Sequence, residues 1–265
     1  MTAVALHHED SAPAGRAGAD GDPVLTLGGS LGTSLAMWEP QRRALAGRVR
    51  MIAVDHRGHG RSPVPAGPYS IADLGGDVLA LMDRLGMERV SWCGLSIGGM
   101  VGQWLAINAP ERIDRLILLC TSAQLPPAES WHERAAAVRA AGSPEPIADT
   151  VLGRWFTEGF AIAHPEVVAR YRALIVATPA EGYAACCEAI AGMDLRAGLD
   201  AITAPTLVIA ARQDPSIPPD HGERIAAAVA GARLEILDPG AHLASVERAD
   251  DVSALIADHL SLQGG

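Results

Sequence analysis

The sequence contains no lysine, because all 21 of its Lys and Arg residues are arginine. Several enzyme classes depend on a lysine side chain. They include P-loop nucleotide-binding proteins, protein kinases, pyridoxal-phosphate enzymes, Schiff-base aldolases and the SxxK serine hydrolases. The absence of lysine excludes all of these classes.

Positive charge is also scarce relative to negative charge. The 31 acidic residues outnumber the arginines, and the formal net charge is −10. A surface of this sign repels phosphate backbones, so we expect no nucleic-acid partner. A hydrophobic share of 49% and a charged share of 20% are typical of a globular chain with a large core.

Cysteine is rare and its spacing does not resemble a zinc site. The four residues are Cys93, Cys120, Cys186 and Cys187. The first residues lack a basic region followed by an apolar one, so no signal peptide is expected. No apolar run reaches the about 18 residues of a membrane helix. We therefore expect a cytoplasmic protein with no membrane partner and no bound metal, while the oligomeric state stays open.

Apolar segments alternate between strand-like and helix-like patterns along most of the chain. Short apolar runs predict strands at 24–27, 49–54, 89–93, 115–120, 206–210 and 234–237. Helical spacing predicts helices at 35–45, 71–85, 98–108, 220–229 and 251–260. Residues 10–23 are polar, with Gly and Pro, and predict a loop. The alternation indicates an α/β fold with a mostly parallel sheet covered by helices on both faces.

The alternation is interrupted between residues 122 and 198, where helix-like stretches occur without a convincing strand. We therefore predict a core formed by residues 1–121 and 199–265, with 122–198 as a helical insertion. Six of the ten aromatic residues fall in the insertion. They either pack a small helical layer or cover an apolar cleft, and the sequence leaves both alternatives open.

A candidate nucleophile lies between a predicted strand and a predicted helix. The segment Gly94-Leu95-Ser96-Ile97-Gly98 fits the pattern G-x-S-x-G. In this context the pattern is typical of a nucleophile elbow, whose tight turn requires small flanking residues and exposes the serine above the sheet. The alternative is a glycine-rich turn with an incidental serine.

A nucleophilic serine requires a base, and the base requires a carboxylate that orients it. Asp214 follows the predicted strand 206–210, and His242 follows the strand 234–237. Both come after the serine in the order Ser, Asp, His, so we predict Ser96, Asp214 and His242 as catalytic residues. Asp238 is the competing acidic neighbour, but its position at the strand end favours a turn.

The tetrahedral intermediate of acyl transfer requires two backbone N–H donors. One is expected from Ile97, which follows the nucleophile, and the other from the loop 28–33, where Leu31 is the candidate. His56 and His59 share an H-x-x-H spacing, but no third ligand accompanies them. This spacing therefore does not change the expectation that no metal is bound.

These motifs together resemble the α/β-hydrolase superfamily along nearly the whole chain. Residues 55–62, Asp-His-Arg-Gly-His-Gly-Arg-Ser, resemble its D-x-R-G-x-G-x-S segment. Within the superfamily the chain is most similar to the 3-oxoadipate enol-lactonases, through residues 30–38, 94–100 and 154–157. Many relatives carry His-Gly before the oxyanion residue, whereas this chain has Gly29-Ser30, as the enol-lactonase variant does.

The resemblance implies an α/β-hydrolase fold with a helical cap over residues 122–198. It also implies hydrolysis of 3-oxoadipate enol-lactone to 3-oxoadipate in aromatic catabolism, without a cofactor. The substrate carries a carboxylate, so arginine must supply the attraction in this lysine-free, acidic chain. Arg134 and Arg154 are the candidates, with Trp131 and Trp155 as aromatic walls.

Other functions fit the same motifs. A broad carboxylesterase or a cofactor-free haloperoxidase or perhydrolase would share the fold and the triad. An acyltransferase would pass the acyl group to an alcohol or a thiol instead of water. A non-catalytic ligand receptor on a hydrolase scaffold is the alternative from a different class.

Overall fold

The computed structural model describes residues 2–11 and 23–262, and its centre is a seven-stranded sheet. The spatial order of the strands is β1-β3-β2-β4-β5-β6-β7. β1 pairs antiparallel with β3, and the other five pairings are parallel. The predicted mostly parallel α/β architecture is confirmed. The strands are β1 (His8–Ser11), β2 (Val24–Gly28), β3 (Arg50–Val54), β4 (Val90–Leu95), β5 (Ile113–Leu119), β6 (Thr206–Ala211) and β7 (Arg233–Leu237).

Helices cover both faces of the sheet because successive strand residues point to opposite sides. In β3, Ile52 and Val54 pack into one core cluster, whereas Met51 and Ala53 pack into a second. The first cluster includes α2 (Ile71–Arg84), α3 (Ile97–Asn108) and α9 (Pro219–Ala228). The second includes α11 (Ala249–His259) and the residues around α1 (Glu39–Ala44). Short helical segments lie at Leu35–Trp38, Pro110–Arg112, Arg196–Ala201 and α10 (Ala244–Glu247).

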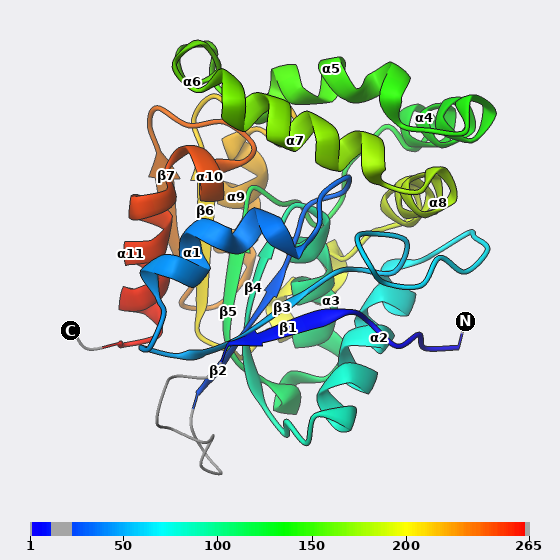
Figure 1. Cartoon of the computed structure of the whole chain (residues 1–265). Helices are drawn as coiled ribbons and strands as arrows, with labels where there is room; N and C mark the ends of the chain where they lie inside the picture. The colour runs from blue at the N-terminus through cyan, green and yellow to red at the C-terminus, as the bar shows by residue number, and fades with distance from the viewer. Residues whose placement is uncertain (1, 12–22, 263–265) are drawn as a thin grey trace.

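Five helices lie together above one end of the sheet (Figure 1). We call them the cap helices: α4 (Ala128–Ala141), α5 (Glu145–Trp155), α6 (Glu158–Ala163), α7 (Pro165–Ala177) and α8 (Ala180–Ala191). α4 packs against α8, and α5 packs against α7. The aromatic residues of α5 to α7 contact one another: Phe156 packs edge-to-face on Tyr171, and Phe160 stacks on Phe156.

One strand was not predicted from the sequence. The loop expected at 10–23 is wrong at its start, because Asp10 and Ser11 belong to β1; residues 12–22 lie outside the described residues. The four residues of β1 are polar and have little strand propensity. Pairing with Met51–Val54 of β3 at the edge of the sheet overrides that propensity.

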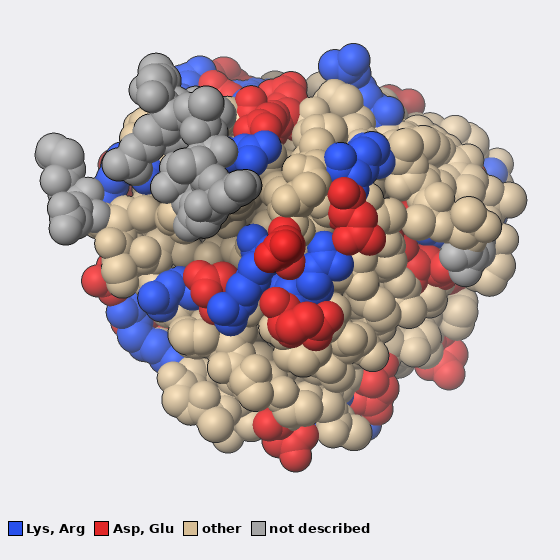
Figure 2. All heavy atoms as spheres, turned by 90° about the horizontal axis from the view of Figure 1, so that it is seen from below, with Lys and Arg blue, Asp and Glu red and all other residues tan. Residues whose placement is uncertain are grey.

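The face of the molecule that is turned away from the cap helices carries arginine and acidic side chains interspersed with one another (Figure 2). Exposed ion pairs of the chain include Arg112 with Asp83 and Arg233 with Asp258. Among the described residues no single helix is long and apolar enough to cross a membrane; α7 and α8 pass that test only as a pair bent by 92°.

A buried ion pair connects the loop after β3 to α2. Arg57 Nε donates to Asp77 Oδ2 at 2.6 Å and Arg57 Nη2 donates to Asp77 Oδ1 at 2.7 Å, and both side chains are fully buried. The Val4 amide also donates to Asp77, at 2.7 Å, and the Arg57 guanidinium lies over the Tyr69 ring. The pair therefore anchors the N-terminal segment as well as the loop.

We predict that Asp77→Ala lowers the free energy of unfolding by about 3–5 kcal/mol, because it leaves the Arg57 charge buried without its partner. Urea unfolding measures the change. The control is Glu39→Ala, which removes an exposed pair with Arg43 and is expected to cost about 1 kcal/mol or less. Equal effects of the two substitutions would contradict the prediction.

Candidate active site

The turn from β4 to α3 places Ser96 in a conformation that non-glycine residues rarely adopt. Its φ is 58° and its ψ is −117°. A Cβ at Gly94 would overlap the Gly98 carbonyl, and a Cβ at Gly98 would overlap the Gly28 carbonyl. The strained backbone is held by Ser96 N–H to Leu119 O at 3.0 Å and by Thr121 Oγ1 to Ser96 O at 2.7 Å. The expected strand-turn-helix context of the G-x-S-x-G pattern is therefore present.

The predicted base and carboxylate meet at the carboxyl ends of β6 and β7. His242 Nδ1 lies 2.8 Å from Asp214 Oδ2, and both side chains are almost fully buried. Asp214 Oδ1 accepts bonds from the amides of Ser216 and Ile217 at 2.8 and 3.0 Å. The carboxylate is thus fixed on one side by backbone and presents its other oxygen to the imidazole, which leaves Nε2 available for a proton from a nucleophile.

A buried cysteine completes the surroundings of Asp214. Burial, reinforced by the neighbouring Asp214 carboxylate, raises the pKa of the Cys120 thiol well above its usual value. The thiol stays protonated at neutral pH and adds no negative charge beside Asp214.

The two amides predicted for the oxyanion hole have no acceptor among the described residues. Leu31 lies in the turn after β2, and Ile97 is the first residue of α3. The amides beside them are bonded: Gly32 N–H donates to His59 Nε2 at 3.0 Å, and Gly98 N–H donates to Gly29 O at 3.2 Å. Unpaired backbone donors at a loop and a helix N-terminus are suited to stabilise a developing oxyanion.

His59, the second residue of the H-x-x-H pair, and Asp55 hold the loop that carries Leu31. His59 Nε2 accepts from Gly32, so Nδ1 carries the proton and donates to Arg57 O at 3.3 Å. Asp55 Oδ1 accepts from the Leu35 amide at 2.7 Å. Burial is the main cause of the lowered pKa of His59, and it favours the neutral ring that these bonds require. Among the described residues no cluster of three or more potential ligands could hold a metal.

A cavity lies between these loops and the cap helices, and its empty space together with its opening to solvent is about 490 Å³. Two of the predicted catalytic residues, Ser96 and His242, open into it, and so does Leu31. Asp214 and Ile97 are not among the residues that line it. The lining residues are Ser30, Leu31, Ser96, Leu125, Trp131, Arg134, Val151, Arg154, Trp155, Tyr183, Ile190, Ser216, Ile217 and His242.

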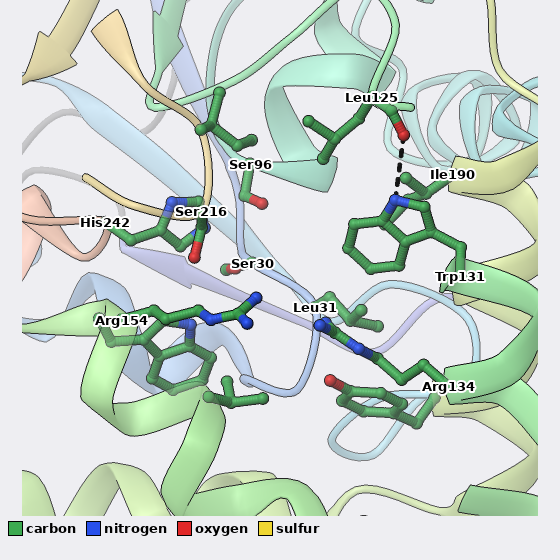
Figure 3. A pocket seen from close by; sticks show the side chains of 14 residues that line it. Ser30, Leu31, Ser96, Leu125, Trp131, Arg134, Arg154, Ile190, Ser216 and His242 are labelled. Atoms are coloured by element: carbon green, nitrogen blue, oxygen red, sulfur yellow. Dashed lines mark hydrogen bonds between the residues drawn. The ribbon is translucent and has the colours of Figure 1, made fainter. Parts of the chain in front are cut away.

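All four predicted substrate-contacting residues line the cavity, and both arginines point into it (Figure 3). The Arg134 guanidinium lies 4.7 Å from the centre of the Trp131 ring, whose Nε1 donates to Leu125 O at 3.1 Å. Arg154 makes no hydrogen bond or ion pair with any residue that the structure describes. Two guanidinium groups without a carboxylate partner, in a lining without acidic residues, favour an anionic ligand.

Sequence reasoning missed three hydroxyl groups of the cavity lining. They belong to Ser30, Ser216 and Tyr183. Burial raises the pKa of Tyr183 above its usual value, so this phenol is neutral at working pH. Ser216 lies two residues after Asp214, and that spacing is a signal that could have placed it near the site. Tyr183 comes from a helix whose orientation the sequence does not fix.

Comparisons with known proteins agree with this geometry. The family model described as alpha/beta hydrolase fold matches residues 22–249. The 3-oxoadipate enol-lactonase 2 of Acinetobacter baylyi is 42% identical over 226 residues, which are 85% of this chain and 84% of that protein. A Stutzerimonas stutzeri protein named as a carbamate hydrolase is 31% identical over 249 residues, 92% of this chain and 93% of that protein.

Solved structures give the same result. The crystal structure of the enol-lactonase from Burkholderia xenovorans LB400 has a TM-score of 0.92 and 42% identity, and the match covers 97% of this chain and 96% of that one. The resemblance and the fold predicted from the sequence are therefore confirmed.

The environment of His56 predicts a loss of stability in acid. Burial, followed by the neighbouring His59, lowers the pKa of His56 to about 4, whereas the unfolded chain titrates near its usual value of about 6.5. Below that value the unfolded state binds more protons than the folded state. Stability is therefore fully present above pH 6.5 and is lost as the pH falls toward 4.

Urea unfolding at pH 7 and pH 5 tests this predicted loss of stability in acid. We expect the His56 contribution to lower the unfolding free energy by on the order of 2 kcal/mol at the lower pH. His56→Gln is expected to reduce the difference between the two pH values, whereas the exposed His132→Gln keeps it. An unchanged difference in His56→Gln would assign the acid sensitivity to other groups.

Proposed function

This chain belongs to the α/β-hydrolase fold family, and we propose that it hydrolyses 3-oxoadipate enol-lactone to 3-oxoadipate through an acyl-enzyme on Ser96. The observation that carries the proposal is the cavity itself. It is lined by Ser96, by His242, which is bonded to Asp214, and by two arginines that have no carboxylate partner among the described residues. Enol-lactonase relatives at 42% identity support the choice of substrate.

The proposed reaction begins with the activation of Ser96 by His242. His242 Nε2 takes the proton of Ser96 Oγ as this oxygen attacks the lactone carbonyl, and Asp214 stabilises the imidazolium. The carbonyl oxygen becomes an oxyanion that accepts from the Leu31 and Ile97 amides. The ring C–O bond then breaks, and the leaving enol oxygen receives the proton from His242. The enol tautomerises to the ketone of 3-oxoadipate, which opposes ring closure.

Deacylation repeats these steps with water as the nucleophile. His242 removes a proton from a water molecule that attacks the ester of Ser96, and the same two amides stabilise the second oxyanion. The C–O bond to Ser96 breaks, and His242 returns the proton to Ser96 Oγ. The 3-oxoadipate is released and the free enzyme is regenerated, and no step requires a cofactor.

Arginine supplies the recognition of the substrate carboxylate. Arg134 and Arg154 reach the cavity from different cap helices, α4 and α5, and the tryptophans Trp131 and Trp155 also line it. A planar guanidinium can hold a carboxylate through two hydrogen bonds, and it stays charged at every working pH. The overall charge of −10 repels an anion, so these two side chains must provide the local attraction.

We predict that Ser96→Ala lowers kcat for the enol-lactone by about 10⁴-fold or more, because the nucleophile is removed while the cavity is retained. The loss of ultraviolet absorbance of the lactone measures turnover. A fluorophosphonate is expected to add covalently to Ser96 in the wild type and to leave the variant unlabelled. Thermal unfolding serves as the control for folding, and near wild-type turnover in a folded variant would refute the role of Ser96.

Arg154→Ala and Arg134→Ala are expected to raise KM for the enol-lactone by about tenfold or more, since each removes a charge-assisted contact. Hydrolysis of neutral p-nitrophenyl acetate is expected to change little. Arg61→Ala, an exposed arginine outside the cavity, is the matched control for the change in net charge. Equal losses on both substrates would argue against carboxylate recognition by these arginines.

A broad carboxylesterase, or a carbamate hydrolase like the relative at 31% identity, is the second candidate. It would use the same nucleophile and base on a different carbonyl. Comparison of kcat/KM for the enol-lactone, p-nitrophenyl esters and a simple carbamate separates these functions. A value for the esters or the carbamate that equals or exceeds that for the lactone would replace the proposed substrate. Product analysis with an added alcohol or thiol tests acyl transfer.

A further inference from the structure

One carboxylate joins the loop of His242 to the cap helices. Glu247, the last residue of α10, accepts a hydrogen bond from the Ala241 amide at 3.1 Å. The same carboxylate accepts from the Thr157 amide at 3.3 Å and from the Thr157 hydroxyl. Thr157 lies between α5 and α6 and caps α6. Glu247 therefore binds three donors, from two segments that are far apart in the sequence.

A second contact connects the same two segments. The Leu243 amide donates to Trp155 O at 2.9 Å. The residues directly before and after His242 are thus both tied to cap segment 155–157, Ala241 through Glu247 and Leu243 directly. The rotation and translation of the His242 backbone are restricted on both sides by the cap.

The other side of the His242 loop is tied to the loop of Asp214. Gln213 N–H donates to Gly240 O at 2.9 Å, and Gly240 N–H donates to Gln213 Oε1 at 3.0 Å. The loop of the base is therefore held between the loop of the carboxylate and the cap. Of the two contacts to the cap, one joins backbone groups only and the other depends on the Glu247 carboxylate, so Glu247 is the side chain whose substitution weakens the connection.

The cap segment tied in this way also forms part of the cavity wall. Trp155 lines the cavity, and so does Arg154, which precedes it. Displacement of a reacting group by about 1 Å can cost about 10²-fold in rate. Hydrogen bonds from backbone amides to a carboxylate are strong enough to transmit such positional control.

We infer that Glu247 is a positioning residue that couples the cap to His242, so that the cavity wall and the general base keep one fixed relative placement. The inference rests on the proposed role of His242 in activating Ser96. It does not depend on which ester or lactone is the substrate, because the coupling acts on the base.

The test compares Glu247→Ala, Glu247→Gln, Thr157→Val and the double variant Glu247→Ala/Thr157→Val with the wild type. The measurements are the rate of Ser96 labelling by a fluorophosphonate, and kcat and KM for the enol-lactone and for p-nitrophenyl acetate. Glu158→Ala is the matched control: Glu158 is an exposed carboxylate next to Thr157 with no hydrogen-bond partner among the described residues.

Glu247→Ala is expected to lower the labelling rate and kcat for both substrates by at least about tenfold, because His242 loses its alignment. Glu247→Gln is expected to restore much of the loss, since an amide oxygen in the place of Oε2 still accepts from both the Ala241 and the Thr157 amides. Thr157→Val keeps its backbone amide, and its labelling rate and kcat are expected to fall a few-fold. The double variant is expected to match Glu247→Ala, because the two groups act through one contact. Glu158→Ala is expected to behave as the wild type.

A purely structural role would lower the unfolding temperature of the Glu247 variants but leave the labelling rate per folded molecule unchanged, and that result would overturn the inference. Strictly additive effects of Glu247→Ala and Thr157→Val would also overturn it. If Glu247→Ala does not fold, the labelling rates per folded molecule of Thr157→Val and Glu247→Gln test the inference in the same way. Failure of the wild type to be labelled at Ser96 would refute the proposed function. Equal labelling of the wild type and the Glu247 variants would refute only the positioning role of Glu247.

Discussion

The turn at Ser96 leaves no space for a side chain at Gly94 or Gly98, and this steric constraint determines where the rest of the site lies. Because the backbone of the turn approaches the loop after β2 so closely, Gly98 bonds directly to Gly29. The loop that carries Leu31 is thereby placed beside the first amides of α3. Thr121, after β5, bonds to the Ser96 carbonyl from the other side. Three loops at the carboxyl ends of neighbouring strands thus converge on one serine, which is the place where parallel α/β sheets bind ligands.

The balance of positive and negative side chains differs between the surface of this molecule and its cavity. The chain has an excess of acidic residues, and most of the arginines among the described residues form ion pairs with them. The cavity reverses this balance, because Arg134 and Arg154 face it and no acidic side chain lines it. Asp214 lies behind His242, and its carboxylate is occupied by two amides and the imidazole. The cavity lining therefore carries positive charge, while the Asp214 carboxylate that is bonded to His242 is not part of that lining.

The sequence predicted the parts of the site that depend on the order of strands and loops. Ser96, Asp214 and His242 each follow a buried apolar strand, and parallel strands bring their carboxyl ends together, so the three positions could be proposed without coordinates. Strand β1 could not be predicted, because its polar residues form a strand only through pairing at the sheet edge. The position of the Tyr183 hydroxyl and the hydrogen-bond partners of Glu247 could not be predicted from the sequence either. Both depend on how the cap helices are oriented on the core, and helical periodicity does not encode that orientation.

Two of the places where the cap is attached to the core limit how it can move. At one end Glu247 and Trp155 tie the junction of α5 and α6 to the His242 loop. At the other end Gly182 of α8 packs backbone against backbone on Gly58, where any Cβ would overlap. Arg139 of α4 adds a bond to Glu181, whose carboxylate also accepts from the Gly67 amide. Lifting the whole cap would break both attachments at once.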